Sequence, residues 1–371
     1  MMGDEYKYDI KNAKGKCYDN IEKKEQLSFT KDEDFIQKSL QEKLKDLKEV
    51  EKYFRENNPK FIENFELLDY RDSGGESNVY TVIPIFQKEK NINKAIIKVL
   101  LNNSKKDKKK EYLISYKLKN KNIINNYGYS AIKKNESSMI LMDDARYGSL
   151  RNFQRNLLKR NTLSETFICY LAYQILNSIK YIHKCKVAHM DIKSQNIVID
   201  EYLTTKLIDF SISINYQDKK PNDIIELQCK GTNFYMSQEV LESKKIKIKD
   251  LQKVDLYAFG VILYNLAFGC YPYELTYGDE DNFDVILKKI KQGKIEYNTK
   301  KGYSSYFLDF LSKLIEKDIN QRININEAEK HYWIQGANIL FDEKDQYYNL
   351  EKFTCHLLTD YCKSFNDYIH H

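Results

Sequence analysis

Apolar side chains recur at helical spacing near the start of the chain, at Ile36, Leu40, Leu44, Leu47 and Phe54. Residues 30–33, Thr-Lys-Asp-Glu, form a capping box before them, and Asn-Asn-Pro at residues 57–59 ends the pattern. We therefore predict an amphipathic helix over about residues 31–57, within an N-terminal extension of residues 1–60. Because the apolar seam lasts only a few turns, a strut packed on the body is the simpler interpretation, and a surface for a regulatory partner is the alternative.

Short apolar runs of β type replace this helical pattern after residue 61. They span Phe65–Leu68, Val79–Phe86 and Ala95–Leu101. A Ser-Gly-Gly turn at residues 73–75 separates the first two runs, and a polar stretch over residues 88–94 separates the second from the third. These runs predict three antiparallel strands joined by turns.

Helical patterns dominate the remainder of the sequence. A helix is predicted from about residue 105 to near Asn122, and most of the sequence beyond Leu150 is helical, as in residues 166–176. The predicted fold class is α+β, with a small β-rich lobe followed by a large helical lobe. A cleft between two such lobes is the first place to expect a ligand site.

Composition narrows the functional classes only slightly. The chain has 371 residues, enough for two lobes with a core, and 60 Lys and Arg against 54 Asp and Glu leave a net charge of +6. That charge is far below that of a basic nucleic-acid-binding domain, so no nucleic-acid partner is expected. The seven cysteines have no C-x-x-C spacing, and no apolar run is long enough to span a bilayer. We expect a cytoplasmic protein, with a nuclear location left open.

A glycine-containing turn is the first candidate for chemistry. Residues 72–79 overlay the phosphate-binding pattern G-x-G-x-x-G-x-V, but only Gly74 keeps register, with Gly75 beside it. Taken alone, this turn is more simply an ordinary hairpin turn.

A single lysine ends the apolar run Ala-Ile-Ile-Lys at residues 95–98. Lys98 would be costly to bury unpaired, so an acidic partner is expected. Glu111 fits this role because it lies on the predicted helix that follows the strand.

Two polar segments further along carry the strongest signal. Residues 189–200 read His-Met-Asp-Ile-Lys-Ser-Gln-Asn-Ile-Val-Ile-Asp, and residues 207–211 read Leu-Ile-Asp-Phe-Ser. The order and spacing of Asp191, Asn196 and Asp209 resemble the catalytic loop H-R-D-x-x-x-x-N and the magnesium loop D-F-G of the eukaryotic protein kinase family. Two polar turns between core strands would not explain this spacing.

Further motifs extend the resemblance over about residues 65–335. Residues 231–239 resemble the substrate-binding loop that ends in A-P-E, and residues 255–260 resemble the helix start D-x-W-x-x-G. The resemblance then implies that Arg322 forms a buried pair with Glu239.

The resemblance implies a bilobal protein kinase fold over residues 61–335. The N-lobe would span about residues 61–142, the hinge about 143–146 and the C-lobe about 147–335. Residues 336–371 would then form a C-terminal helical extension.

Carried over to matching positions, the resemblance implies an ATP-dependent phosphotransferase that uses Mg²⁺, with Mn²⁺ as an alternative. Lys98 would contact the α- and β-phosphates, and Glu111 would hold Lys98. Asn196 and Asp209 would hold the metal ion.

The acceptor side of the implied reaction is a protein hydroxyl. Asp191 would take the proton of the substrate hydroxyl, and Lys193 would steady the γ-phosphate. Lys193 and Thr232 resemble the Ser/Thr class of the family rather than the Tyr class, so the implied partners are protein substrates with Ser or Thr.

The resemblance also implies a nucleotide pocket. Gly74 and Gly75 would cover the phosphates, and the base would lie against the gatekeeper Met142 and the hinge backbone. The remaining implied contacts are Asp143 and Ala145 of the hinge and the apolar residues Val79, Ala95 and Val198.

The chain departs from the family pattern at several positions, and these departures keep two alternatives open. Asp72 and Ser77 replace loop glycines, Ser211 replaces the glycine of D-F-G, and Gln238 replaces the proline of A-P-E. The eroded glycine turn favours a pseudokinase that binds ATP as a scaffold with weak or no turnover. A small-molecule kinase of related fold is the second alternative, but the motif at residues 231–239 argues against it.

One departure bears on regulation. Met190 stands where the family usually has an Arg that pairs with a phosphorylated residue, and a thioether donates no hydrogen bond to phosphate. Between Ser211 and Gly231 the only hydroxyl side chains are Ser213 and Tyr216. We therefore predict that activity does not require phosphorylation of this segment.

Overall fold

The computed structural model describes most of the central part of the chain. The described residues are Lys52, 65–74, 77–85, 94–100, 107–132, 137–158, 163–279, 282–298 and 301–340. Apart from Lys52, the predicted helix over residues 31–57 lies outside them, as do Gly75 and residues 341–371. Those predictions remain predictions.

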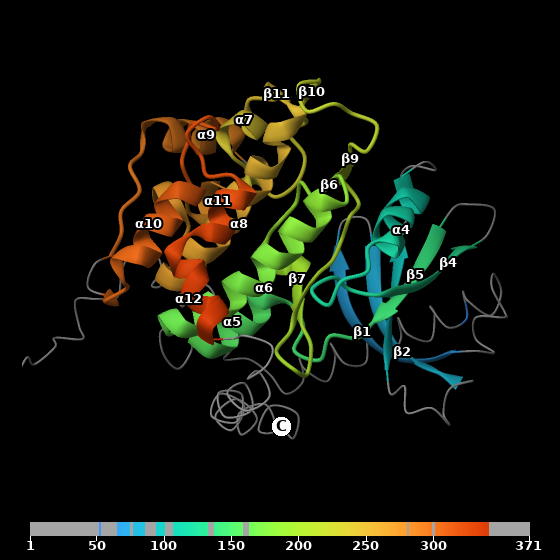
Figure 1. Ribbon diagram of the computed structural model, residues 1–371. Helices are drawn as coiled ribbons and strands as arrows, with labels where there is room; N and C mark the ends of the chain where they lie inside the picture. Colours follow the sequence, from blue (N-terminus) through green and yellow to red (C-terminus); the bar gives the residue numbers. More distant parts are fainter. Residues whose placement is uncertain are drawn as a thin grey trace, which may run out of the picture.

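The small lobe is an antiparallel sheet of five strands with one helix beside it (Figure 1). The strand order is β1-β2-β3-β5-β4, and helix α4 (Asp107–Lys117) contacts β4. The strands are β1 (Phe65–Gly74), β2 (Ser77–Pro84), β3 (Ala95–Leu100), β4 (Asn126–Ile132) and β5 (Ser137–Asp143). All three predicted strands are present, whereas α4 ends at Lys117, before the predicted end near Asn122.

The two faces of this sheet differ in what they contact. Successive side chains of a strand point to opposite faces, and directly opposed residues on neighbouring strands share a face. One face packs a small apolar core of Tyr80, Val82, Ala95, Ile97, Val99 and Met139. Lys98, which lies between two residues of that core, therefore points to the other face, where it contacts Asp209 of the large lobe. The region between this face of the sheet and the large lobe is called the cleft below.

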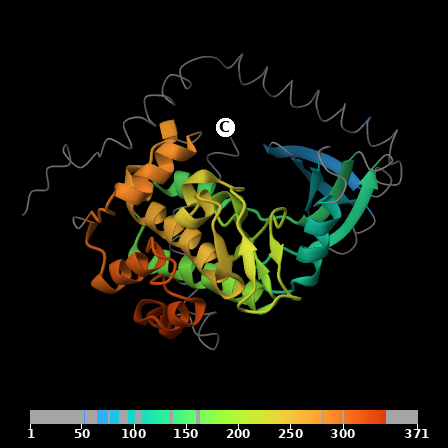
Figure 2. The same ribbon diagram turned by 90° about the horizontal axis from the view of Figure 1, so that it is seen from above.

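The large lobe is mainly helical, as the view from above shows (Figure 2). Its helices are α5 (Leu150–Leu158), α6 (Glu165–Lys184), α7 (Gln238–Leu241), α8 (Leu251–Phe268), α9 (Phe283–Gln292), α10 (Ser305–Leu314), α11 (Ile325–Lys330) and α12 (Tyr332–Leu340). The predicted α+β arrangement of a small β-rich lobe and a large helical lobe is confirmed. Helix α12 runs across the predicted start of the C-terminal extension at residue 336.

Short strands and 3₁₀ turns connect the helices of the large lobe. The strand pairs are β6 (Val187–Ala188) with β9 (Ile214–Asn215), β7 (Ile197–Ile199) with β8 (Thr205–Leu207), and β10 (Ile224–Glu226) with β11 (Lys245–Lys247). The 3₁₀ turns are η3 (Ser194–Asn196), η4 (Asn233–Tyr235), η5 (Ile248–Asp250), η6 (Pro272–Glu274) and η7 (Tyr277–Asp279).

Helix α8 is the centre of the large lobe. It is apolar around nearly its whole circumference, which is typical of a helix buried on all sides. It packs against α6 and α10, and a Cβ added at Gly260 would stand 2.6 Å from Ile315 Cγ2, so the backbones approach closely there. In the described part of the chain, no helix combines the length and the apolar character needed to cross a membrane.

A buried ion pair joins two distant parts of this lobe. Arg322 donates to both carboxylate oxygens of Glu239, at 2.6 Å from Nη1 and 3.2 Å from Nη2. Both side chains are almost fully buried. Arg322 also donates to the carbonyl oxygens of Glu316, Lys253 and Lys317. The predicted pairing of Glu239 with Arg322 is therefore confirmed.

Candidate active site

Lys98 joins the small lobe to the large lobe by its contacts at the cleft. Its Nζ donates to Glu111 Oε1 at 2.8 Å and to Asp209 Oδ1 at 3.0 Å. Burial on its own would lower the pKa of Lys98, but the charges of Glu111 and Asp209 outweigh it, so the pKa lies above its ordinary value. The structure thus brings together a permanently charged lysine, the helix α4 and the segment that follows β8.

Asp209 is held in an ionised state beside this lysine. Burial would raise the pKa of its carboxyl, but the charge and hydrogen bond of Lys98 lower it to about 2. In the described part of the chain, both hydrogen bonds to the carboxylate end on Oδ1, from Lys98 and from the backbone N–H of Ser211 at 3.4 Å. The backbone of Asp209 has φ +65°, in the left-handed region that non-glycine residues seldom adopt and that Asp adopts more readily than most.

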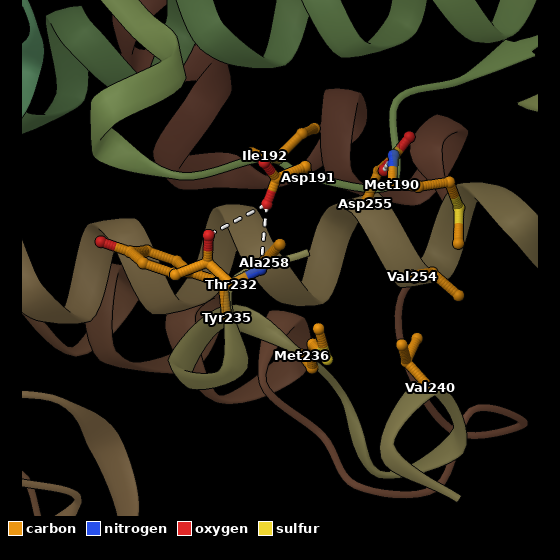
Figure 3. A pocket seen from close by; sticks show the side chains of 10 residues that line it. All are labelled: Met190, Asp191, Ile192, Thr232, Tyr235, Met236, Val240, Val254, Asp255 and Ala258. Atoms are coloured by element: carbon orange, nitrogen blue, oxygen red, sulfur yellow. Dashed lines mark hydrogen bonds between the residues drawn. The ribbon is translucent and has the colours of Figure 1, made fainter. Parts of the chain in front are cut away.

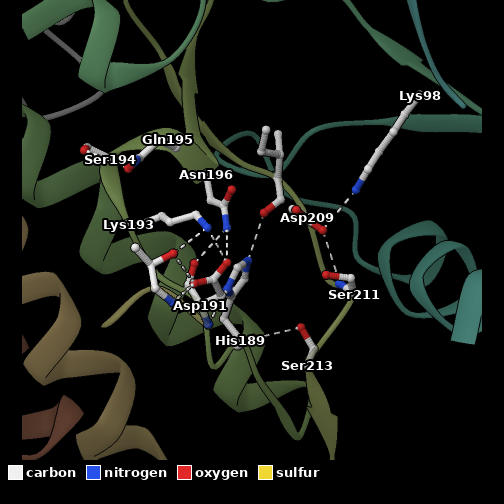
Figure 4. A network of polar contacts seen from close by, with 12 residues as sticks. Lys98, His189, Asp191, Lys193, Ser194, Gln195, Asn196, Asp209, Ser211 and Ser213 are labelled. Atoms are coloured by element: carbon white, nitrogen blue, oxygen red, sulfur yellow. Dashed lines mark hydrogen bonds and ion pairs between the residues drawn. The ribbon is translucent and has the colours of Figure 1, made fainter. Parts of the chain in front are cut away.

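Asp191 lies in the loop between β6 and η3, and both oxygens of its carboxylate accept hydrogen bonds (Figure 4). Oδ1 accepts from the backbone N–H of Thr232 at 3.1 Å and from its hydroxyl at 3.2 Å. Oδ2 accepts from Asn196 Nδ2 at 2.9 Å and lies 2.7 Å from Lys193 Nζ. Lys193 also donates to the Thr232 hydroxyl at 2.6 Å. These contacts fix the direction of the carboxylate.

Asn196 and Asp209 together fit a divalent cation. The side-chain amide nitrogen of Asn196 donates to the carbonyl and the carboxylate of Asp191, which turns the amide oxygen away from that residue. Asp209 contributes an ionised carboxylate, and among the described residues no hydrogen bond ends on its Oδ2, so this oxygen could face a cation. Mg²⁺ prefers such hard oxygen ligands and usually takes only one or two from the protein.

Asp255, at the start of α8, fixes the loop that carries Asp191. Its Oδ1 accepts from the backbone N–H of Met190, and its Oδ2 from the backbone N–H of His189, both at 2.9 Å. His183 Nε2 lies 2.7 Å from Oδ2. Burial would raise the pKa of Asp255, but the hydrogen bond and charge of His183 lower it. The sequence motif at residues 255–260 contained this signal, although Asp255 was not predicted as a site residue.

An apolar cluster supports the segment from Asp209 to Glu239, which we call the activation segment. Met190 and Cys229 both pack against a buried cluster that includes Met236 of the segment and Val240 and Val254 beyond it. Figure 3 shows the small pocket beneath Asp191 and Thr232, with the Met190 side chain pointing toward Val254. The pocket has a volume of about 10 Å³, so it admits no more than about one water molecule.

The two hydroxyls that lie between Ser211 and Gly231, those of Ser213 and Tyr216, are both buried. Ser213 is 0% exposed and donates to the carbonyl oxygen of His189 at 3.1 Å. Tyr216 is 8% exposed, and its hydroxyl lies 3.1 Å from both the carbonyl oxygen and Nδ1 of His183. Neither hydroxyl is accessible to another enzyme while the segment keeps this conformation.

Most residues predicted for the nucleotide pocket lie around the cleft. Val79 is paired with Lys98 and shares its face of the sheet. Met142 and Asp143 end β5, Ala145 follows in the connection to the large lobe, and Val198 lies in β7. Gly74 ends β1.

Ala95 is an exception, because it lies on the opposite face of the sheet from Lys98. It packs with Tyr80 and Val82 in the core of the small lobe. Ile96, two residues before Lys98, occupies the cleft face instead and was not predicted. The period of two along a strand was the signal that could have identified it.

A comparison with protein-family models assigns the chain. The model described as protein kinase domain matches residues 72–334, more than half of the chain. The chain belongs to the protein kinase domain family. Its N-lobe sheet, its α4 helix and its helical C-lobe are accordingly the two lobes of a kinase domain.

Similar curated proteins are kinases of plants and fungi. The chain is 30% identical over 208 residues to the carbon catabolite-derepressing protein kinase of Secale cereale, covering 56% of this chain and 38% of that protein. It is 29% identical over 217 residues to the serine/threonine-protein kinase PKH2 of Candida albicans, covering 57% and 21%. It is also 29% identical over 233 residues to the Aurora kinase of Eremothecium gossypii, covering 63% and 58%. The kinase domain thus spans less than two thirds of the length of each of these relatives.

Proposed function

We propose that this kinase domain transfers the γ-phosphoryl group of ATP to Ser and Thr hydroxyls of protein substrates. The observation that carries the proposal is the contact of Lys98 with both Glu111 and Asp209, at 2.8 and 3.0 Å, across a cleft whose other side holds Asp191 and Asn196. Phosphoryl transfer needs such a set: a cation for the phosphates, ligands for a metal ion and a proton acceptor.

Lys98, Asp209 and Asn196 are the residues proposed to bind the nucleotide and its metal ion. Lys98 is charged and held in place by Glu111, which suits it to bind the α- and β-phosphates. Asp209 and Asn196 would hold Mg²⁺ or Mn²⁺, and the bound metal ion would offset the negative charge of the phosphates. Most of the catalytic effect would then come from positioning and charge neutralisation.

Asp191 and Lys193 are the residues proposed to act on the substrate hydroxyl, which accepts the phosphoryl group. The Thr232 hydroxyl lies 3.2 Å from Asp191 Oδ1, which indicates that a hydroxyl group can reach this oxygen. The substrate hydroxyl would give its proton to Asp191 as its oxygen bonds to the γ-phosphorus and the bond to the ADP oxygen breaks. Lys193 would steady the transferred group.

The base of the nucleotide would lie between the two lobes. Val79 and Ile96 from the sheet and Val198 from β7 are the apolar residues proposed to contact it, with Ile96 in place of Ala95. Met142 would limit the depth of the pocket, and the backbone of Asp143 and Ala145 would offer hydrogen bonds to the base.

The Ser/Thr class rests on two supports. Several curated relatives are by name serine/threonine-protein kinases. In addition, Lys193 donates to Thr232 at 2.6 Å, and these two residues resemble the Ser/Thr branch of the family. The proposed partners are therefore proteins with accessible Ser or Thr.

A scaffold that binds ATP without turnover is the second candidate. The observation in its favour is the replacement of two glycines by Asp72 and Ser77 at the turn between β1 and β2, which restricts the backbone there.

The deciding experiment incubates the purified chain with Mg²⁺, γ-labelled ATP and a generic protein substrate, followed by phosphoamino-acid analysis. We expect labelled phosphoserine and phosphothreonine. Nucleotide binding without any transfer would favour the scaffold, and label on tyrosine alone would contradict the Ser/Thr class.

A further inference from the structure

Arg71 of β1 makes two side-chain contacts that reach beyond its own strand. Its Nε donates to Thr81 Oγ1 of β2 at 3.0 Å, and its Nη2 donates to Asp144 Oδ2 at 3.1 Å. Asp144 lies directly after β5, in the connection between the lobes. The pair of Arg71 and Asp144, called here the Arg71–Asp144 bridge, therefore ties the first strand of the small lobe to the hinge.

An irregularity of β1 places Arg71 for this contact. The strand pairing passes from Tyr70 opposite Tyr80 to Asp72 opposite Val79, which leaves Arg71 without a paired residue on β2. Such a β-bulge re-aims the side chain of the extra residue. The bridge thus follows from a local feature of this strand.

The bridge lies on the cleft side of the sheet. Thr81 is paired with Ile96, and Ile96 with Met142, so these three share the face of Lys98. Because Arg71 donates to the Thr81 hydroxyl, its guanidinium group lies at this face, at the end of the sheet nearest the hinge. The base of a nucleotide in the cleft would enter beside it.

The burial of Asp144 makes its cation partner important. The side chains of Arg71 and Asp144 are 32% and 14% exposed. Asp144 Oδ1 is buried and has no hydrogen-bond partner among the described residues. A largely buried carboxylate with one unsatisfied oxygen is costly, so the contact with Arg71 offsets part of that cost.

We propose that the Arg71–Asp144 bridge is a latch at the entrance of the nucleotide cleft. It holds β1, whose C-terminal end leads into the glycine-containing turn, against the hinge and so slows the exchange of bound nucleotide. This inference rests on the proposed function, because it assigns a positioning role at the ATP site of that function.

Nucleotide exchange kinetics test the latch directly. A fluorescent ATP analogue with Mg²⁺ is displaced by excess ATP from the parent, Arg71→Met, Asp144→Asn and the double variant. Each single variant is expected to release the analogue about threefold to fivefold faster, the range expected for a partly exposed ion pair. The double variant should be no faster than the faster single variant, because both changes break one bridge. Lys313→Met is the matched control, since it removes the exposed pair of Lys313 with Asp309 on α10.

Two outcomes would overturn the latch while leaving the proposed function intact. One is release at the parental rate by both single variants, and the other is a fully additive effect in the double variant. If the parent binds no nucleotide at all, the proposed function fails and the latch fails with it.

Hydrogen exchange on the nucleotide-free protein provides a readout that does not depend on ATP. Backbone amides of β1 and β2 near Tyr70 and Tyr80 should exchange faster in Arg71→Met than in the parent, because the strand is released from the hinge. Unchanged exchange in these strands would contradict the latch.

Discussion

At the scale of single residues, the site contains two carboxylates, Asp191 and Asp209, that differ in the hydrogen bonds they accept. Asp191 accepts hydrogen bonds on both oxygens, so its direction is fixed. Asp209 accepts on one oxygen only within the described residues, and Lys98 lowers its pKa to about 2. These surroundings suit Asp191 to act on a positioned hydroxyl and Asp209 to bind a cation.

Gly231 is the residue whose replacement most directly tests the position of Asp191. Its φ of +117° is unfavourable for any other residue, and an added Cβ would stand 3.1 Å from Asp191 Oδ1. We expect Gly231→Ala to lower kcat by about tenfold or more, equivalent to roughly 1.4 kcal/mol of transition-state stabilisation, while the protein stays folded.

The matched control for this change is Gly128→Ala. Gly128 lies in β4, and an added Cβ there would meet no heavy atom within 4 Å. Initial rates at saturating ATP, with circular dichroism to check folding, separate the two variants. Parental activity in Gly231→Ala would mean that Asp191 is not held as described.

At the scale of elements, the buried pair of Glu239 and Arg322 anchors the end of the activation segment to the helical lobe. Arg322→Ala leaves the Glu239 carboxylate buried without its partner, at a cost of roughly 3–5 kcal/mol. For a domain of this size the melting temperature should fall by on the order of 10 °C. Thermal unfolding measures the change.

The control for Arg322 is an exposed pair. Lys245→Ala removes the contact with Glu226, whose side chain is 65% exposed, and should change the stability by less than about 1 kcal/mol. Equal melting temperatures for Arg322→Ala and the parent would show that the pair contributes nothing to the anchor.

The activation segment is held by packing and by side-chain hydrogen bonds. Met190 joins an apolar cluster, and the hydroxyls of Ser213 and Tyr216 are buried and hydrogen-bonded. We therefore expect phosphatase treatment to leave the initial rate at saturating ATP unchanged. The Ser213→Ala, Tyr216→Phe double variant should stay within about tenfold of the parent, because it loses only the hydrogen bonds of two hydroxyl groups, none of them to a proposed reacting residue. A larger fall in rate on phosphatase treatment would show that a phosphate on the segment is needed after all.

At the scale of the whole molecule, the sequence predicted the order of the lobes because their patterns differ. Short apolar runs bounded by turn residues predicted the first three strands, and helical spacing predicted the large lobe. The fixed spacing from Asp191 to Asn196 and the separate Asp209 led to residues that the fold brings together. These residues are close in sequence or sit in rigid turns, so local patterns contain enough information to find them.

Contacts that depend on tertiary geometry could not be predicted in this way. Ala95 was assigned to the pocket, but the strand period places it in the core and Ile96 at the cleft. The contact of Arg71 with Asp144 joins residues far apart in the sequence through a β-bulge, which no local pattern indicates. Asp255 was visible as a motif, yet its hydrogen bonds to His189 and Met190 appear only when α8 packs beneath the loop.

The most direct test of the central claim compares phosphoryl transfer by the parent, Lys98→Met and Asp191→Asn. Lys98→Met removes the charge proposed to hold the phosphates, and Asp191→Asn removes the proposed proton acceptor while keeping its shape. We expect both variants to lose transfer of labelled γ-phosphate to protein, with melting temperatures that show a folded chain. Near-parental turnover in either folded variant would contradict the assignment of this cleft as the active site.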